Sequence, residues 1–423
     1  MANKIQTVKG TREFYPEEMA LRNYLYSKVR AASQSFGYQE WDGPFIEPIE
    51  LYAAKSGEEL VKKQSFTFED RGGDLVTLRP ELTPSLARMI AAKQNELTYP
   101  VRWWSFGPFW RYEQPQKGRS REFFQWNIDM LGVNSPEADA ELIAVAATFL
   151  RSVKLDPGRA SIYVNNRRLM DSQFDAIGIP PEKRMDVSNV VDRRSKMDAV
   201  KWDAYVLDSG LTQSQLDGLK SILGNFDLWK QSDELVRLFA ALKALGVKEY
   251  VKFDPNIVRG LLYYTSTVFE AFDTSGFVKR SILGGGRYDN LLADVGGAPL
   301  PATGFAMGDV VIGIVLQEAG LLPEFVPTPA SVLVTVFDES MWLKSYELAA
   351  QLREAGLNAM AYPEPAKLQK QFKFADKMKV RVAVTVGPDE DAKGLAALKD
   401  LLSGEQVTVT RDALVDEIRK VIG

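Results

Sequence analysis

A proline-rich segment divides the sequence into two parts that differ in pattern. Residues 321–331 read LLPEFVPTPAS and contain three prolines. Proline fixes φ and has no backbone N–H, so this segment cannot form a helix interior or a central strand. We therefore expect a linker here, with a long folded part before it and a shorter folded part after it.

In the part after the linker, residues 323–423, apolar runs alternate with amphipathic helical patterns. The runs are ASVLVTVF, NAMAY and RVAVTVG, and this alternation is typical of a small α/β domain with a largely parallel sheet. Residues 367–377 predict a helix on which Lys370, Lys373 and Lys377 form one stripe. Such a stripe is either a solvated face or a patch that contacts a nucleic-acid backbone.

The part before the linker begins with a helix and continues as a mixture of strands and helices. Apolar residues at helical spacing predict a helix from Glu17 to Phe36, and the pattern stops at Gly37. Extended patterns follow at 41–50, 75–83, 101–113 and 121–133, and helical patterns at 84–94 and 136–150. Strands joined through hairpins and helices predict an antiparallel α+β core.

This core is interrupted by an insertion. Residues 169–248 carry short helical patterns with scattered charge, which predict a mostly helical insertion between core segments 1–168 and 249–322. In the second core segment, a strand pattern at 264–272 is followed by a Gly-rich turn and a closing helix that ends near Gly320.

The composition excludes whole classes of chemistry. The sequence contains no His and no Cys, so it has no Ser-His-Asp triad, cysteine nucleophile, disulfide or metal site built from His or Cys. Any chemistry must use carboxylates, Arg, Lys, Tyr, hydroxyl and backbone groups. Because the net charge is −4, a nucleic-acid site would be a local basic patch on an acidic chain.

The sequence shows no sign of a membrane segment or of a targeting signal. No apolar run reaches the roughly 18 residues that a membrane span requires. The opening MANKIQTVKGTREFYPEE lacks the organisation of a signal peptide. We expect a cytoplasmic protein that does not bind membranes.

The stretch REFFQWNID, residues 121–129, is the most informative part of the core pattern. A strand here has one apolar face and one face that carries charged, polar and aromatic groups. The second face is formed by Arg121, Phe123, Gln125, Asn127 and Asp129. A solvated strand also alternates in this way. However, a cation, an aromatic plane and hydrogen-bond acceptors on one face are what a nucleotide and a small zwitterion require.

A similar alternation occurs in TLRPELT, where Thr77, Arg79, Glu81 and Thr83 would share one face of a strand. Glu81 and Thr83 are suited to holding an ammonium group, although such a face is usually just solvated.

The segment FWRYEQPQKGR, residues 109–119, reads as two strand ends around a loop. Arg111 is suited to an α-phosphate and Arg121 to outer phosphates, because a guanidinium binds phosphate in a bidentate fork. The loop is rich in Gln, Lys and Arg, which makes Gln116 and Arg119 candidates for contact with RNA.

Two later segments add candidate residues. VRGLLYY contains Arg259, Tyr263 and Tyr264 around a glycine. Pairs of tyrosines more often pack than bind ligands, but an Arg directly before Gly at a strand edge is harder to explain by packing. The segment Gly284–Asp289, GGGRYD, is expected to be a turn where the backbone approaches a ligand closely.

These motifs, in their order and spacing, resemble the histidyl-tRNA synthetase family of class II aminoacyl-tRNA synthetases over essentially the whole chain. VKGTREFYPEE resembles that family's opening signature, and residues 37–44 resemble the first class II motif, which implies a homodimer. Residues 111–125 resemble the second motif, TLRPELT the amino-acid-binding strand, and VRGLLYYT the signature of histidine enzymes. The last domain resembles an anticodon-binding domain.

The resemblance implies a role for each matched residue. Arg111, Arg121 and Phe123 would bind ATP, and Arg111 and Arg259 would be catalytic. The residues implied in histidine binding are Glu81, Thr83, Arg111, Gln125, Asp129, Arg259, Tyr263 and Tyr264. Those implied in tRNA binding are Gln116, Arg119, Lys370 and Lys373.

The implied reaction is the ATP-dependent formation of histidyl-adenylate, with Mg²⁺, followed by transfer to the 3′ end of tRNA(His). The chain departs from the family where the third motif usually ends in an Arg that sandwiches adenine. Here the segment Gly304–Val311 reads GFAMGDVV and contains no Arg.

Two other functions remain open at this point. One is a non-catalytic paralogue that senses histidine and regulates ATP phosphoribosyltransferase. Such proteins usually lack the C-terminal domain and lose ATP-binding residues, both of which this chain retains. The other is a ligase that adenylates histidine without tRNA, which the basic stripe and the 114–119 loop disfavour.

Overall fold

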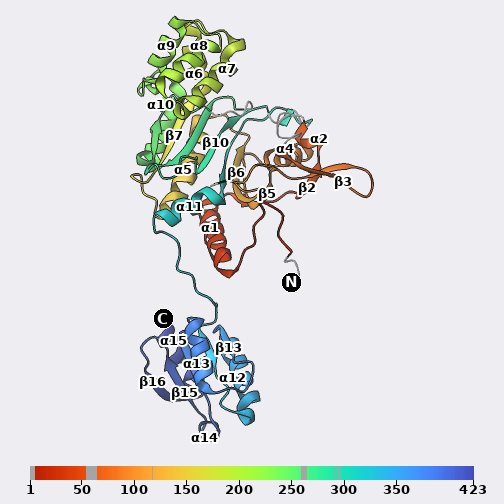
Figure 1. Ribbon diagram of the computed structural model, residues 1–423, viewed down its shortest axis with the longest axis vertical. Helices are drawn as coiled ribbons and strands as arrows, with labels where there is room; N and C mark the ends of the chain where they lie inside the picture. The colour runs from red at the N-terminus through yellow and green to blue at the C-terminus, as the bar shows by residue number, and fades with distance from the viewer. Residues whose placement is uncertain (1–4, 54–63, 117, 259–263, 291, 294–295) are drawn as a thin grey trace. The chain divides into compact units, whose positions relative to one another are not determined.

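The computed structural model describes residues 5–53, 64–116, 118–258, 264–290, 292–293 and 296–423. These residues divide into two compact units. The first comprises residues up to Glu13 together with Leu21–Pro323, and the second comprises Phe14–Ala20 together with Glu324–Gly423. Figure 1 labels the elements of each unit. Among the described residues, no helix combines the length and apolar character that a membrane crossing requires.

An eight-stranded sheet forms the centre of the first unit. Its strands lie in the order β1-β5-β6-β11-β10-β9-β7-β8. They are β1 (Gln39–Glu40), β5 (Val101–Trp110), β6 (Glu122–Leu131), β7 (Ala160–Asn166), β8 (Val251–Phe253), β9 (Thr267–Asp273), β10 (Leu283–Tyr288) and β11 (Ala302–Gly308). Neighbouring strands are antiparallel except β1 with β5 and β7 with β8. The predicted antiparallel α+β core is confirmed.

Helices cover the apolar face of this sheet. They are α1 (Pro16–Ser35), α5 (Pro136–Ser152) and α11 (Asp309–Glu318). Helix α5 begins where the Ser135 side chain accepts a hydrogen bond from the Ala138 N–H, and Pro136 occupies its first turn. Trp126 and Ile128 of β6 are buried in the same core. The apolar half of the REFFQWNID pattern therefore faces the core, as expected.

A buried ion pair fixes α5 to the sheet. Arg287 of β10 bonds Asp139 at 2.7 Å, and both side chains are 2% exposed. Arg287 also donates to the carbonyl oxygens of Val133 and Ser135. Separating the two side chains would leave an uncompensated buried charge, which is costly. The pair therefore resists any shift of β10 relative to α5.

The chain leaves the sheet after β7 and returns at β8. The helices between them are α6 (Arg167–Ala176), α7 (Arg184–Arg193), α8 (Ala199–Asp208), α9 (Gln213–Leu223) and α10 (Asp233–Ala244), gathered at one end of the unit (Figure 1). Side chains of Asn166, Asp198, Thr212 and Ser232 cap four of them. The helical character predicted for this stretch is present.

The first unit also contains a three-stranded sheet with the strand order β2-β4-β3. Its strands are β2 (Ile46–Pro48), β3 (Phe66–Glu69) and β4 (Leu75–Leu78), and it is accompanied by α2 (Glu50–Ala53) and α4 (Thr83–Ala92). The predicted strand 75–83 is therefore too long. Pro80 lacks an N–H for the ladder, so strand β4 ends before it, and Thr83 begins a helix.

The Gly-rich segment Gly284–Asp289 is also corrected. Its first five residues belong to β10, which is buried along its length and paired with β9 and β11. Glycine occurs here because neighbours approach closely, since a methyl group on Gly285 would overlap Phe305. The prediction failed because a glycine run signals a turn only when no neighbouring strand demands the space.

The second unit contains a five-stranded sheet in the order β13-β12-β14-β15-β16. Its elements are β12 (Val332–Val334), α12 (Trp342–Glu354), β13 (Ala359–Ala361), α13 (Leu368–Lys377), β14 (Val382–Thr385), α14 (Pro388–Ala392), β15 (Leu395–Asp400), β16 (Gln406–Thr410) and α15 (Leu414–Ile422). The three predicted apolar runs pair in parallel. Strands β15 and β16 add an antiparallel hairpin that the pattern did not indicate.

Candidate active site

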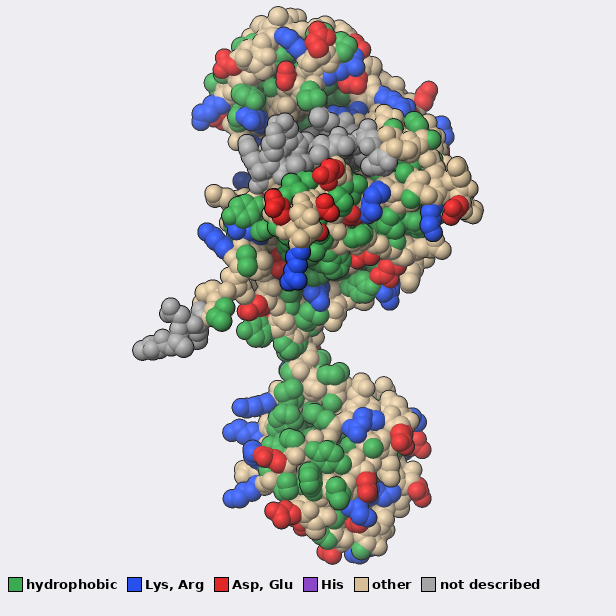
Figure 2. Space-filling view, turned by 90° about the vertical axis from the view of Figure 1, so that its right-hand side faces the viewer, with side chains coloured by type: hydrophobic (Ala, Val, Ile, Leu, Met, Phe, Trp, Pro, Cys, Tyr) green, Lys and Arg blue, Asp and Glu red, His purple; other side chains and the backbone are tan. Residues whose placement is uncertain are grey.

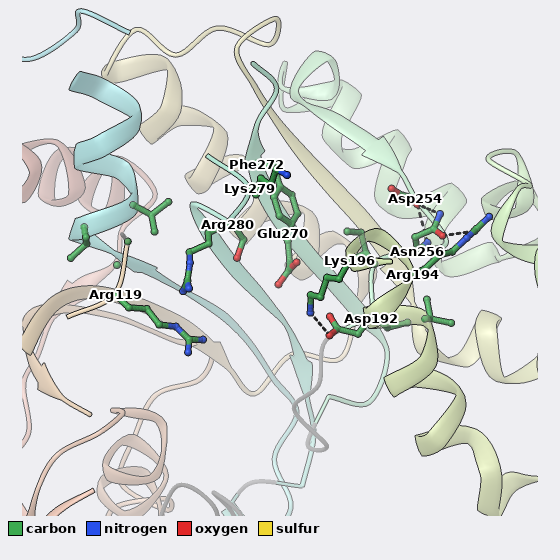
Figure 3. Close-up of a pocket in the computed structure, with 18 of the residues that line it drawn as sticks. Arg119, Asp192, Arg194, Lys196, Asp254, Asn256, Glu270, Phe272, Lys279 and Arg280 are labelled. Atoms are coloured by element: carbon green, nitrogen blue, oxygen red, sulfur yellow. Dashed lines mark hydrogen bonds and ion pairs between the residues drawn. The ribbon is translucent and has the colours of Figure 1, made fainter. Parts of the chain in front are cut away.

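A pocket of about 1070 Å³ opens in the first unit between the large sheet and the helical insertion. The core contributes Arg111, Phe123 and Arg280 to its lining, and the insertion contributes Arg194 and Lys196. Figure 3 shows Arg119 and Arg280 on one side of the pocket and Arg194 and Lys196 on the other.

Arg111 and Phe123 form an aromatic and cationic end of the pocket. The Phe123 ring stacks on Phe109, with centroids 5.9 Å apart. The Arg111 guanidinium lies 5.3 Å from the Phe123 ring centroid, and its Nε donates to the Pro80 carbonyl oxygen at 2.9 Å. A flat ring beside an oriented guanidinium suits an adenine and a phosphate.

Arg121 does not line this pocket. Its guanidinium stacks 3.9 Å above the Tyr112 ring, and its Nε donates to the Glu113 carbonyl oxygen. The Arg121 backbone N–H donates to Gly10 at 2.8 Å. Gly10 has a φ of +88°, and a methyl group there would overlap the Arg121 side chain. The opening signature therefore supports the start of β6.

In the loop before β6, Gln116 and Arg119 pair through their backbones. Arg119 lines the pocket and bonds Glu113 at 3.0 Å. Gln116 is exposed and does not belong to the lining.

Gln125, Asn127 and Asp129 extend from one face of β6, as the alternation predicts. Their partners on β11 are small, namely Gly308, Ala306 and Gly304. The three polar side chains therefore stand beside a strip of sheet with almost no side chains. The amide nitrogen of Asn127 is buried without a hydrogen-bond partner among the described residues.

Asp129 is 6% exposed, and the Tyr288 hydroxyl donates to its Oδ1 at 2.6 Å. Burial raises the pKa of Asp129 to about 7, and the hydrogen bond from Tyr288 opposes this shift. Gly304 is required at this point because a methyl group there would overlap the Asp129 carboxylate. Sequence reasoning missed Tyr288, since nothing local links residues 129 and 288.

Tyr264 is buried in the same apolar cluster as Tyr288. Its ring packs where Gly286 has no side chain, and Arg167 donates to its carbonyl oxygen at 2.7 Å. The structure therefore brings Asp129 and Tyr264 to strand β10 from segments distant in sequence. Arg259 and Tyr263 lie outside the described residues.

Glu81 lies in the turn between β4 and α4, and Thr83 is the first residue of α4. Buried Arg79 fixes this turn to β5 because its Nε donates to Pro108 and its guanidinium stacks between Phe45 and Phe109. Arg79 also pairs with Asp42. Glu81 and Thr83 are not part of the pocket lining.

The insertion side of the pocket was not predicted as part of a site. Lys196 pairs with Asp192 at 2.6 Å, and Arg194 donates to Asn256 at 2.7 Å (Figure 3). The sequence carried no signal for these residues beyond scattered charge, because their position depends on how the insertion packs on the core.

In the second unit, Lys370 and Lys373 lie on α13 as predicted. Lys370 pairs with Glu364 at 2.8 Å, and Lys373 is exposed. Gln371, between them, is buried and bonds the backbone of Val336 in both directions. In Figure 2, hydrophobic side chains gather on one face of this unit with Lys and Arg at its edge.

The predominantly antiparallel sheet carries Arg111, Phe123 and the polar side chains of β6 beside the small residues Gly304, Ala306 and Gly308 of β11, an arrangement that matches the class II aminoacyl-tRNA synthetases. The family model for histidyl-tRNA synthetase matches residues 10–309, and the model for an anticodon binding domain matches residues 331–421. The chain belongs to the histidyl-tRNA synthetase family.

Relatives match over nearly the full length. The histidine–tRNA ligase of Leptospira biflexa is 36% identical over 98% of this chain and 97% of that protein. The histidine–tRNA ligase of Opitutus terrae is 37% identical over 98% of each. The crystal structure of histidyl-tRNA synthetase from Nostoc sp. superimposes with a TM-score of 0.86 at 28% identity, over 99% of both chains.

The regulatory alternative has weaker support. A protein from Bacillus halodurans, described as an ATP phosphoribosyltransferase regulatory subunit/histidyl-tRNA synthetase, covers 88% of this chain and 97% of its own with a TM-score of 0.73. Its identity is 20%, so the likeness concerns the fold alone.

Proposed function

We propose that this protein activates L-histidine with ATP as histidyl-adenylate and transfers the histidyl group to the 3′ end of tRNA(His). The observation that carries this proposal is the match to histidine–tRNA ligases along the whole chain. The arrangement of Arg111 and Phe123 at one end of a pocket supports it, as does the contact that Asp129 and Tyr264 each make with strand β10.

The first step needs no histidine or cysteine in the enzyme. The substrate carboxylate is already an anionic nucleophile, so catalysis requires alignment with the α-phosphate and stabilisation of negative charge. We assign these tasks to Arg111 and Arg259. Phe123 would stack on the adenine, and Arg121 would bind the outer phosphates.

Recognition of histidine would use the polar groups above the glycine strip. Asp129 would accept from one imidazole nitrogen, and Tyr264, beside Tyr263, would pair with the other. Glu81, Thr83 and Gln125 would hold the α-amino group. A site built for two hydrogen bonds rejects apolar isosteres strongly, because its own polar groups would then be left unpaired.

Mg²⁺ is proposed as a companion of ATP. No cluster of three or more acidic side chains suited to a metal ion is present among the described residues. Mg²⁺ bound with a nucleotide needs only one or two carboxylates, since phosphates and water supply the other ligands. Glu113 and Glu270 line the pocket on the core side and fit that role. The ion would neutralise phosphate charge.

For tRNA, we propose that Gln116 and Arg119 contact the acceptor end and that Lys370 and Lys373 contact the anticodon region. This assigns residues 323–423 to anticodon binding, 1–168 and 249–322 to the catalytic core, and 169–248 to an insertion. A cytoplasmic location, where ATP and tRNA are available, agrees with this function.

A homodimer is proposed from the three-stranded sheet. Ile46, Pro48, Phe68 and Val76 lie on one face of it by their pairing register. Ile46 is 51% exposed and Phe68 is 44% exposed. An apolar sheet face left open to solvent is suited to a second copy of the chain.

The test is ATP–pyrophosphate exchange measured with each of the common amino acids separately, followed by aminoacylation of tRNA. We expect exchange with histidine alone and charging of tRNA(His). Histidine binding without exchange would instead indicate a regulatory subunit, and exchange without tRNA binding would indicate a free amino-acid ligase.

A further inference from the structure

Arg280 is an arginine of the pocket for which sequence reasoning found no role. It lies in the connection between β9 and β10, is half-buried, and lines the pocket together with Arg111, Arg119 and Phe123. Figure 3 shows Arg280 and Arg119 on the same side of the pocket. The nucleotide end of the pocket therefore has a cation that neither β5 nor β6 supplies.

Arg280 pairs with no carboxylate among the described residues. Within the described ranges, it makes no hydrogen bond, ion pair or ring contact. The carboxylate whose charge acts on Arg280 is that of Glu113, and Arg119 bonds this carboxylate at 3.0 Å. Burial and the charge of Arg119 both lower the pKa of Arg280. An anion between the two arginines would relieve both effects.

The position of Arg280 is defined by two neighbours. A methyl group placed on Gly118 would lie 3.3 Å from Arg280 Cδ and 3.9 Å from Val311 Cγ2. Arg280 and Val311 therefore flank the same glycine of the loop before β6. Val311 lies in the first turn of α11 and ends the segment Gly304–Val311, which contains no arginine or lysine.

We propose that Arg280 binds the polyphosphate chain of ATP from the β9–β10 connection, beside the segment Gly304–Val311, which supplies no cation to the pocket. Guanidinium binds phosphate oxygens in a bidentate fork, and a half-buried one loses less of this energy to water. On the core side of the pocket, Arg111, Arg119, Lys279 and Arg280 outnumber the carboxylates of Glu113 and Glu270, so this side favours a polyanion.

The inference rests on the proposed function. The kinetics of ATP–pyrophosphate exchange distinguish failure of the inference from failure of the proposed function. The Arg280→Ala variant should raise the KM for ATP by about 10- to 100-fold, as expected for the loss of a charged hydrogen bond, and leave the KM for histidine unchanged. The Arg280→Lys variant should fall between this variant and the wild type, because lysine keeps the charge and loses the fork. The matched control is Lys243→Ala, which removes an exposed charge that does not line the pocket.

Two inhibitors decide which part of the nucleotide Arg280 contacts. Inorganic tripolyphosphate should compete with ATP about tenfold less well in Arg280→Ala, whereas adenosine should compete equally in both proteins. An unchanged KM for ATP, or an equal weakening of adenosine, would overturn the proposal. Wild-type protein that shows no exchange at all would instead refute the proposed function. Melting temperatures of both Arg280 variants show whether they fold. If Arg280→Ala does not fold, the same measurements on Arg280→Lys decide the proposal.

Discussion

At the scale of single residues, Asp129 shows how burial prepares a carboxyl group for recognition. Its pKa of about 7 means that near neutral pH it exists both as a carboxylate and as a carboxylic acid. Only the carboxylate accepts a hydrogen bond from an imidazole N–H at either oxygen. Because Tyr288 donates to Oδ1, it favours the carboxylate and orients it.

We predict that Tyr288→Phe shifts the pH dependence of kcat/KM for histidine to higher pH. The hydrogen bond lowers the pKa of Asp129, so its loss raises that pKa and delays formation of the carboxylate as pH increases. The measurement is ATP–pyrophosphate exchange between about pH 6 and pH 9. Free histidine titrates identically in both reactions, so the difference between the two profiles reports the enzyme.

The titratable neighbours of Asp129 are limited in the described part of the site. Strands β5 and β11 place Trp103 and Gly304 beside it, neither of which titrates. Tyr38 is a further titratable group, and its own pKa is raised partly by Asp129. Tyr250→Phe is the control because it removes a buried tyrosine hydroxyl that donates to the Leu155 carbonyl oxygen rather than to Asp129. Parallel profiles for wild type and Tyr288→Phe would contradict the prediction.

At the scale of elements, strand β11 joins β6 to β10 and carries no large side chain next to Asp129. We predict that Gly304→Ala destabilises the fold by roughly 1–3 kcal/mol, the usual cost of overpacking. The added methyl group would meet both the Asp129 carboxylate and the Ile128 carbonyl oxygen. Thermal unfolding should show a lower Tm, and exchange with histidine should fall at least tenfold.

Gly308→Ala on the same strand is the matched control for stability, since nothing lies within 4 Å of its added methyl group. Equal melting temperatures for the two variants would show that β6 and β11 tolerate a side chain at position 304.

Helix α13 gives the second element-scale prediction. Replacing Lys370 and Lys373 by Ala should weaken tRNA binding, lower its salt dependence by about one to two counterions and leave histidine activation unchanged. The measurement is tRNA affinity across salt concentrations. Lys377→Ala removes a charge from the last turn of the same helix, so it shows whether the effect on tRNA affinity depends on where along α13 the charge is lost. An unchanged salt slope would mean that the stripe is only a solvated face.

At the scale of the whole molecule, the two units have separate apolar cores. The first unit leaves the apolar face of β2-β4-β3 exposed. We predict that the wild type is a dimer at micromolar concentration and that Ile46→Asp or Phe68→Asp makes it monomeric, because a buried unpaired carboxylate is costly. Light scattering after size exclusion gives the mass.

Leu402→Asp is the control for the dimer. Leu402 is 79% exposed in the second unit, so a charge there should leave the mass unchanged. A monomeric wild type, or dimeric Ile46 and Phe68 variants, would place any interface elsewhere.

Local pattern was sufficient for features that depend on one segment alone. The prolines at 321–331 marked the boundary region, and alternation along REFFQWNID identified which side chains of β6 face the apolar core and which lie on the opposite face. The absence of His and Cys limited the chemistry before any fold was known. Each of these follows from backbone geometry or from composition, which chain packing does not change.

Tertiary structure alone decided which distant segments meet. It made the Gly284–Tyr288 stretch a buried strand, brought Tyr288 to Asp129, and placed Arg280 beside Val311. The physical reason is that strand periodicity reports two faces of one strand but not its partners. The pairing of β6 with β11 joins residues 171 to 183 positions apart, and the pairing of β11 with β10 then brings Tyr288 to Asp129, 159 positions away. No local preference encodes such distances.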